Sequence, residues 1–280
     1  MKIVDIDKLF DKYIEKYVYE NIGKIKPEEI ENQIPKLYEE FGNKEIKELD
    51  DKTPNTYYKS FTGKELLDCL KSHVEQNVSV SDFLCEAMIA KEDIDKDIYE
   101  LLLKENSEEY VLYLMNILND IGSKIAIKRY LEFIIWDYSE PIRELATELL
   151  CGFAEDVKEE ILSQFKDTDE NKKVNLTEIL SHTKKDDRVY NILIEEFVKN
   201  SDNIPLYAGY LASYGDERAL PFLEATIEGD KINYADFEEL RFAIEALGGE
   251  YKGKRDFTND STYKKIKGAK PGRVLYEPYY

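Results

Sequence analysis

The sequence predicts an all-α protein, and three observations support this fold class. Apolar residues recur at spacings of three and four along most of the chain, as at Leu66, Leu70 and Val74, which is the pattern of amphipathic helices. The eight prolines fit helix starts, short linkers or the C-terminal segment. Only residues 78–81 alternate between apolar and polar side chains as a β-strand would, and four residues are too few to form a sheet.

The chain is expected to have three parts, each with its own sequence pattern. In residues 1–60, spaced apolar residues such as Leu9, Tyr13 and Tyr17 predict an N-terminal helical cap. Residues 61–250 carry the longest helical patterns, which recur along this part of the chain. Residues 251–280 are rich in lysine, arginine and glycine and are predicted to form an extended basic tail.

A repeated helical block occupies most of the central part. Each block ends in a leucine, and four residues before it, one residue before it and at the leucine itself the side chain is apolar. The five anchor leucines, Leu118, Leu150, Leu180, Leu211 and Leu247, are separated by 32, 30, 31 and 36 residues. A second amphipathic helix follows most blocks. Because a single helix pair cannot bury its apolar face, neighbouring pairs are expected to stack into an α-solenoid.

The residues of the central blocks resemble the HEAT-repeat pattern. Residues 137–150 have an acidic residue in the turn, then proline, an aliphatic residue, arginine and small residues before a leucine, and residues 214–223 and 240–248 resemble further repeats. The period is shorter than the roughly 40–47 residues of long HEAT arrays and is similar to that of short bacterial HEAT-like repeats of the phycobilisome-lyase type. The resemblance implies an armadillo-like superhelix of helix pairs over residues 106–250 and, loosely, 62–105, and it implies no activity.

Composition and charge exclude several classes of protein. The formal net charge is −20 and the pI is about 4.7, so the chain as a whole repels phosphate backbones and anionic membranes. The N-terminus carries charge and no apolar signal segment follows it, and no stretch has the length and hydrophobicity of a membrane span. The three cysteines each follow an apolar stretch and are expected to be buried free thiols. We expect a cytoplasmic protein.

No catalytic, metal or cofactor site is predicted. His73 and His182 lie far apart, and neither belongs to a metal-binding spacing. Cys69 and His73 share a helix face, but no third group is evident to orient them, and Cys69 lies beside apolar residues. Residues 248–254 contain glycines without the spacing of a phosphate-binding loop. These observations favour a protein that is not an enzyme.

The best candidates for a binding site lie two residues before each anchor leucine. This column holds Asn116, Glu148, Glu178, Gly209 and Glu245. Because the apolar positions of each block face the core, the column is predicted to point away from it. In the HEAT family the resemblance implies that such a column lines the concave face, as an acidic groove for a basic partner peptide. The alternative is an ordinary solvated helix face.

Three further residues are candidates for partner binding. Tyr207 and Tyr210 flank Gly209 and either form a pocket for a peptide side chain or fill core positions. Arg241 either binds an anionic group or, as the family resemblance implies for such arginines, supports a turn between helices. Arg143, paired with Asp137, fits this second role better.

The C-terminal segment differs from the rest of the chain in charge. Residues 251–280 hold eight basic and three acidic residues, a net charge of +5. Because the whole chain carries −20, residues 1–250 carry a net charge of −25. The interleaved lysines, arginines and aromatic residues are compatible with nucleic acid, but the acidic body opposes a polyanion. A segment that folds back and caps the last repeat is the favoured hypothesis.

The sequence therefore predicts a non-enzymatic scaffold or adaptor that binds a protein or peptide partner through an acidic face. It needs no cofactor, and its oligomeric state is open. The alternative is a HEAT-like enzyme such as an alkylated-base DNA glycosylase or a bilin lyase. The glycosylase should have a basic concave face, which the charge of this chain opposes. An acidic mimic of nucleic acid is a third possibility.

Overall fold

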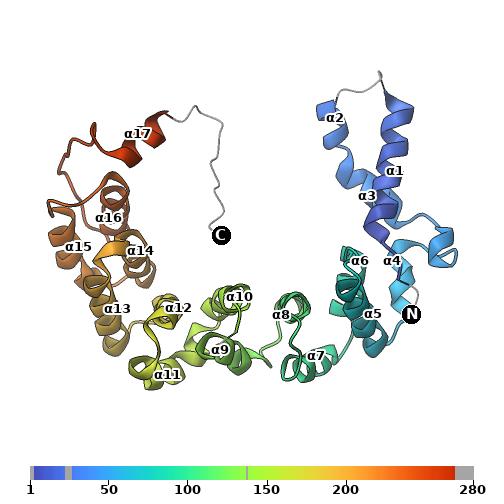
Figure 1. Ribbon diagram of the computed structural model, residues 1–280, viewed down its shortest axis with the longest axis horizontal. Helices are drawn as coiled ribbons and strands as arrows, with labels where there is room; N and C mark the ends of the chain where they lie inside the picture. Colours follow the sequence, from blue (N-terminus) through green and yellow to red (C-terminus); the bar gives the residue numbers. More distant parts are fainter. Residues whose placement is uncertain (1–2, 23–26, 137, 269–280) are drawn as a thin grey trace. The chain divides into compact units, whose positions relative to one another are not determined.

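The computed structural model describes residues 3–22, 27–136 and 138–268. These residues form helices joined by short connections, and they contain no strand (Figure 1). One isolated bridge joins Ile46 and Lys52. The predicted all-α class is confirmed.

The chain divides into two compact units, Met1–Ala146 and Thr147–Tyr280. The sequence did not indicate a division at this point, and the predicted limits at residues 60 and 250 stay predictions. The helices of the first unit are α1 (Ile6–Asn21), α2 (Pro27–Glu31), α3 (Ile34–Gly42), α4 (Pro54–Tyr57), α5 (Gly63–Glu75), α6 (Asp82–Ile89), α7 (Ile94–Leu102), α8 (Glu108–Ile121) and α9 (Ile127–Ile135). Helix α10 (Glu140–Cys151) crosses the boundary.

An aromatic cluster joins the N-terminal helices to the rest of the first unit. The ring of Tyr38 on α3 lies 4.9 Å from that of Phe10 on α1 and stacks at 5.1 Å on Phe83 of α6. Phe41, one turn after Tyr38, contacts both Phe10 and Phe83. Aromatic pairs of this kind add roughly 0.5–1.5 kcal/mol to the stabilisation from buried area. The spaced aromatic residues of the predicted helical cap therefore attach it to α6.

The second unit alternates between two sets of helices. Its helices are α11 (Ala154–Gln164), α12 (Glu170–Ser181), α13 (Asp187–Lys199), α14 (Ile204–Tyr214), α15 (Leu220–Ile227), α16 (Tyr234–Ala246) and α17 (Ser261–Gly268). Helices α12, α14 and α16 lie in one layer, in which α14 packs against both α12 and α16 (Figure 1). Helices α11, α13 and α15 pack against α12, α14 and α16, respectively.

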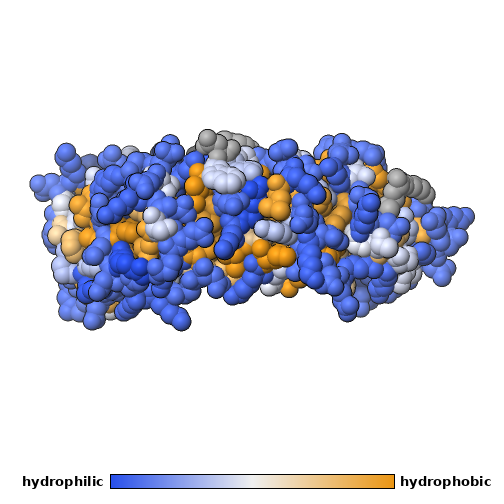
Figure 2. Space-filling model, turned by 90° about the horizontal axis from the view of Figure 1, so that it is seen from below, coloured by the Kyte–Doolittle hydropathy of each residue, from blue (hydrophilic) through white to orange (hydrophobic). Residues whose placement is uncertain are grey.

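The anchor column forms the core as predicted. Leu118, Leu150, Leu180 and Leu211 are at most 1% exposed, and Leu247 is 8% exposed. The apolar positions before them are buried in the same way, with one exception. Ala246, the last residue of α16, is exposed. Polar and charged side chains predominate on the face drawn in Figure 2, with apolar side chains visible between them.

The basic C-terminal segment is not wholly extended, which corrects the prediction. Residues 261–268 form helix α17, whose first turn is capped by Asp260: its carboxylate accepts a hydrogen bond of 2.9 Å from the N–H of Tyr263. The segment before α17 packs on α16, where the ring centroid of Phe257 lies 5.1 Å from that of Phe237. The described part of this segment therefore covers α16, while residues 269–280 lie outside the described residues.

Candidate functional site

The acidic column of the second unit has three carboxylates on three anchor helices. Glu148 on α10 and Glu245 on α16 are exposed, and among the described residues neither forms an ion pair. Glu178 on α12 is half-buried and accepts a hydrogen bond of 3.2 Å from the hydroxyl of Tyr210 on α14. Glu148 and Glu245 thus have oxygen atoms available to a partner, whereas Glu178 already bonds to the neighbouring helix.

Tyr207 and Tyr210 are core residues, the second of the two predicted possibilities. Their side chains are only 6% and 8% exposed, and their rings meet edge to face at 5.7 Å. Burial and the nearby Glu178 raise the pKa of the Tyr210 hydroxyl, so it remains a neutral donor. Little of either ring is therefore exposed to a partner.

Gly209 leaves a gap in the column between the carboxylates of α12 and α16. A Cβ atom placed on Gly209 would have no atom within 4 Å, so the space beside α14 is open at this point. Glycine inside a helix is about 1 kcal/mol less favourable than alanine. Nothing in the fold requires glycine here.

The two predicted arginines differ in their surroundings. Arg241 donates from Nη2 to Glu238 on its own helix at 2.7 Å, which raises the pKa of its guanidinium group. Its Nε is buried and, among the described residues, has no hydrogen-bond partner. Arg143 donates to the carbonyl of Tyr138 at 3.4 Å. The predicted partner of Arg143, Asp137, lies outside the described residues.

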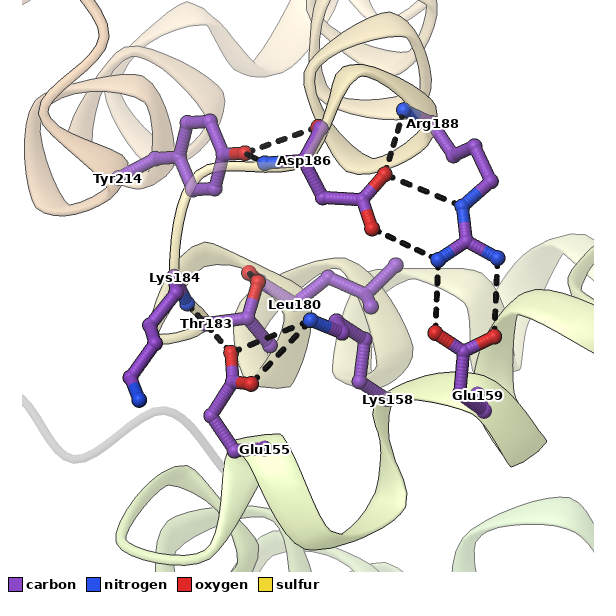
Figure 3. A network of polar contacts seen from close by, with 9 residues as sticks. All are labelled: Glu155, Lys158, Glu159, Leu180, Thr183, Lys184, Asp186, Arg188 and Tyr214. Atoms are coloured by element: carbon purple, nitrogen blue, oxygen red, sulfur yellow. Dashed lines mark hydrogen bonds and ion pairs between the residues drawn. The ribbon is translucent and has the colours of Figure 1, made fainter.

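Arginines that the sequence analysis did not single out join successive helix pairs. In Figure 3, Arg188 bonds to Asp186 in its own turn at 2.7 Å and to both carboxylate oxygens of Glu159 on α11 at 2.9 and 2.7 Å. Arg218 repeats the arrangement, with Asp216 at 2.7 Å and Asp187 at 2.8 Å. The sequence pattern that could have indicated these arginine bridges is Asp-x-Arg, which occurs at 186–188 and again 30 residues later at 216–218.

Tyr214 at the end of α14 is hydrogen-bonded to the turn that contains Asp186. Its hydroxyl accepts a hydrogen bond from the N–H of Asp186 at 2.6 Å and donates one to the carbonyl of Asp186 at 3.0 Å (Figure 3). Glu155 on α11 accepts from the N–H of Lys184 at 2.5 Å. The turn between α12 and α13 is thus bonded to the helix before this pair and to the anchor helix after it, which fixes the register of three successive pairs.

The Asp186 turn should make stability depend on pH in a defined window. Hydrogen bonds from Arg188 lower the pKa of Asp186 from 3.8 to about 2. The carboxylate therefore stabilises the fold fully above about pH 4, and this contribution is lost as the pH falls towards 2. NMR titration of the carboxyl carbon should give a midpoint near 2 in the native protein and a higher one in Arg188→Gln. An unchanged midpoint in the variant would contradict the assigned cause.

Cys69 and His73, which share a helix face, are both buried. Cys69 is 2% exposed, and burial raises the pKa of its thiol to about 11, so it is protonated at neutral pH. The Nδ1 atom of His73 lies 2.8 Å from the carbonyl oxygen of Cys69. Burial also raises the pKa of the half-buried thiols Cys85 and Cys151, to about 11 and 12. All three cysteines are free, and full burial is confirmed for Cys69 alone.

Within the described ranges, no three or more histidine, cysteine, aspartate or glutamate side chains are grouped as ligands of a metal ion. None of the described helices is both long enough and apolar enough to span a membrane. Comparison of the chain with protein-family models, with curated proteins and with solved structures finds no match.

Proposed function

We propose that the protein is a non-enzymatic scaffold or adaptor whose second unit binds a basic protein or peptide along the solvent-facing side of its anchor helices. The observation that carries the proposal is the pair of exposed carboxylates, Glu148 and Glu245, on two anchor helices, with the open space at Gly209 on another. Carboxylates without an ion pair are suited to lysine and arginine side chains, and they steer a basic partner towards the face.

The distribution of ion pairs supports this choice of face. Other carboxylates of the second unit are already engaged: Arg188 pairs with Asp186 and with Glu159 on α11, and Arg218 pairs with Asp216. On the anchor helices, Glu148 and Glu245 form no ion pair or hydrogen bond among the described residues, although Arg241, one turn before Glu245, interacts with it electrostatically. A cationic partner would therefore displace existing ion pairs at the turns and would displace none at these two glutamates.

We further infer that the helix pairs are HEAT-like repeats of an α-solenoid. The layer of α12, α14 and α16, the matching positions of α11, α13 and α15, and the repeated arginine bridges all support this inference. In a solenoid each pair contacts only its neighbours, and the ordered layer leaves a continuous surface for an extended partner. A cytoplasmic location stays a prediction from the sequence.

Charge reversal on the proposed face tests the function. The tagged full-length protein is used to capture partners from its native lysate at graded salt, and each captured protein is then purified and titrated. Glu148→Lys combined with Glu245→Lys should weaken binding about tenfold or more, since like charges across an interface cost several kcal/mol. Gly209→Leu should also block it, because the added side chain occupies open space and leaves the fold intact.

Glu160→Lys on α11 is the matched control, since Glu160 is also exposed but lies on the other set of helices. It should bind the partner as the native protein does. Equal loss in Glu160→Lys and in the double variant would show a general charge effect and would contradict the proposed face. Circular dichroism checks that each variant is folded.

A further inference from the structure

A cleft of about 480 Å³ lies between α16 and the chain that follows it. Its walls come from the side of α16 that carries Tyr234 and Arg241, from the irregular residues 251–257 and from Tyr263 on α17. The volume is within the range of roughly 300–1,000 Å³ that is typical of small-molecule sites. The cleft therefore has room for one small ligand.

One wall of the cleft is aromatic. The ring of Tyr234 meets Phe257 at 5.4 Å and Tyr263 at 5.0 Å, in both cases edge to face. Phe237 lies 5.1 Å from Phe257 and extends the wall along α16. These contacts hold the aromatic rings of the wall in place relative to one another. The planar ring of a ligand could pack against them in the same edge-to-face geometry.

Gly253 allows the chain to follow this wall closely. A Cβ atom at this position would overlap the hydroxyl of Tyr251, so a larger residue would fit only if the Tyr251 ring moved. The Tyr251 hydroxyl donates to Glu228 at 2.7 Å, which holds the ring over the glycine. Residues 251–253 are thus bonded to Glu228 and form one wall of the cleft.

The acidic residues of the cleft already have hydrogen-bond donors. Glu238 accepts from Arg241 at 2.7 Å. Asp256 accepts from the N–H and the hydroxyl of Thr258 at 2.9 and 2.7 Å, which lowers its pKa and keeps it ionised. Neither carboxylate needs a cationic ligand.

Lys252 pairs with Glu250 at 3.0 Å, but the other three basic residues of the cleft have donors to spare. The Nε of Arg241 is buried and, within the described part of the chain, unpaired. Arg255 donates from Nη1 to the carbonyl of Gly229 at 2.8 Å, which leaves the other nitrogens of its guanidinium group for a ligand. Lys254 is exposed and has no ion pair among the described residues. A buried donor without a partner is unfavourable, and an anionic acceptor would satisfy it.

We propose that this cleft binds a small aromatic phosphate, with the ring against Tyr234, Phe257 and Tyr263 and the phosphate held by Arg241, Lys254 and Arg255. Guanidinium groups bind phosphate oxygens through paired, charge-assisted hydrogen bonds, and a doubly charged phosphate matches several cations better than a carboxylate does. Nucleotides and phosphotyrosine share this chemistry. The proposal is independent of the partner-binding face.

Calorimetric titration of the full-length protein with three probes tests the ligand class. Adenosine monophosphate and phosphotyrosine supply a ring and a phosphate, and inorganic phosphate supplies the anion alone. At least one aromatic phosphate should bind about tenfold more tightly than inorganic phosphate, and the affinity should fall as salt is raised. Which of the two binds more tightly identifies the source of the ligand. Absence of saturable binding by both would overturn the proposal.

Two charge-neutralising variants locate the site. Arg241→Gln and Lys254→Gln should each weaken binding of the aromatic phosphate by about tenfold, the loss expected for a charge-assisted hydrogen bond. Lys254 is exposed, so Lys254→Gln keeps the fold and remains informative if Arg241→Gln does not. Lys265→Gln on α17 removes the same charge outside the cleft and should bind as the native protein does. Unchanged binding by Lys254→Gln, or equal weakening in the control, would place the ligand elsewhere.

Discussion

Replacement of Leu180 by alanine is expected to lower the free energy of unfolding by about 3 kcal/mol. The Leu180 side chain is fully buried on α12, the helix that packs against both α13 and α14. The substitution removes three buried carbon atoms and leaves a cavity that neighbouring side chains on three helices line. For a domain of this size, the loss corresponds to a fall of roughly 6–12 °C in melting temperature. Urea denaturation at constant m-value measures the change directly.

Val198→Ala is the matched control for Leu180→Ala. Val198 is also apolar and lies on α13, but it is 60% exposed. Its truncation should change the free energy of unfolding by less than about 0.5 kcal/mol. Similar losses in the two variants would mean that the anchor column does not form the core of the second unit.

The helices that Leu180→Ala destabilises distinguish a stack of helix pairs from a single undivided core. Amide hydrogen exchange in Leu180→Ala should accelerate in α12, α13 and α14, which contact one another. Helices α5 and α6 belong to the other compact unit and should keep their protection. Uniform acceleration through both units would contradict a modular fold.

The core was predictable because its signal is periodic. Each anchor leucine is preceded by apolar residues at fixed distances, and a helix converts that spacing into one buried face. The exception, Ala246, is the last residue of α16. The C-terminal segment was predicted to be extended because glycines and prolines recur in it. Residues 261–267 contain neither, and Asp260 caps the helix that they form.

The polar interactions were less predictable, because they depend on which residues the fold brings together. The spacing of Tyr210 favours a core position but leaves a binding position open, and its burial agrees with the core position. The Arg188–Glu159 pair joins residues 29 apart. Only the repeated Asp-x-Arg spacing could have indicated it. The cleft beside α16 depends on a loop path that places Phe257 against Phe237, and no local pattern specifies that path.

Arg129 is the clearest case of a residue whose importance only the fold reveals. Charged residues are normally exposed, yet Arg129 on α9 is 7% exposed. Its Nε donates to the carbonyl of Leu102 at the end of α7 at 3.0 Å, and its Nη2 donates to the hydroxyl of Tyr138 at 2.7 Å. The guanidinium also lies 4.7 Å from the ring of Phe133. One side chain therefore joins α7, α9 and the chain after α9.

Arg129→Ala is expected to lower the free energy of unfolding by about 3 kcal/mol. The substitution removes the donor to the Leu102 carbonyl, and a buried polar group left without a partner costs roughly 1–3 kcal/mol. It also leaves a cavity beside Phe133. Glu132, which accepts from Nη1 at 2.8 Å, is 41% exposed, so water can replace that hydrogen bond and its loss adds little. Urea denaturation should show the whole change as a lower midpoint.

Two further variants separate the hydrogen bonds from the buried volume. Arg129→Met keeps an unbranched apolar stem but has no donors, so it should recover only the part of the loss that comes from the cavity. Lys128→Ala removes a positive charge from the neighbouring exposed position and should change the free energy of unfolding by less than about 0.5 kcal/mol. If Arg129→Met were as stable as the native protein, the hydrogen bond to Leu102 would contribute nothing net, and Arg129 would act through its volume alone.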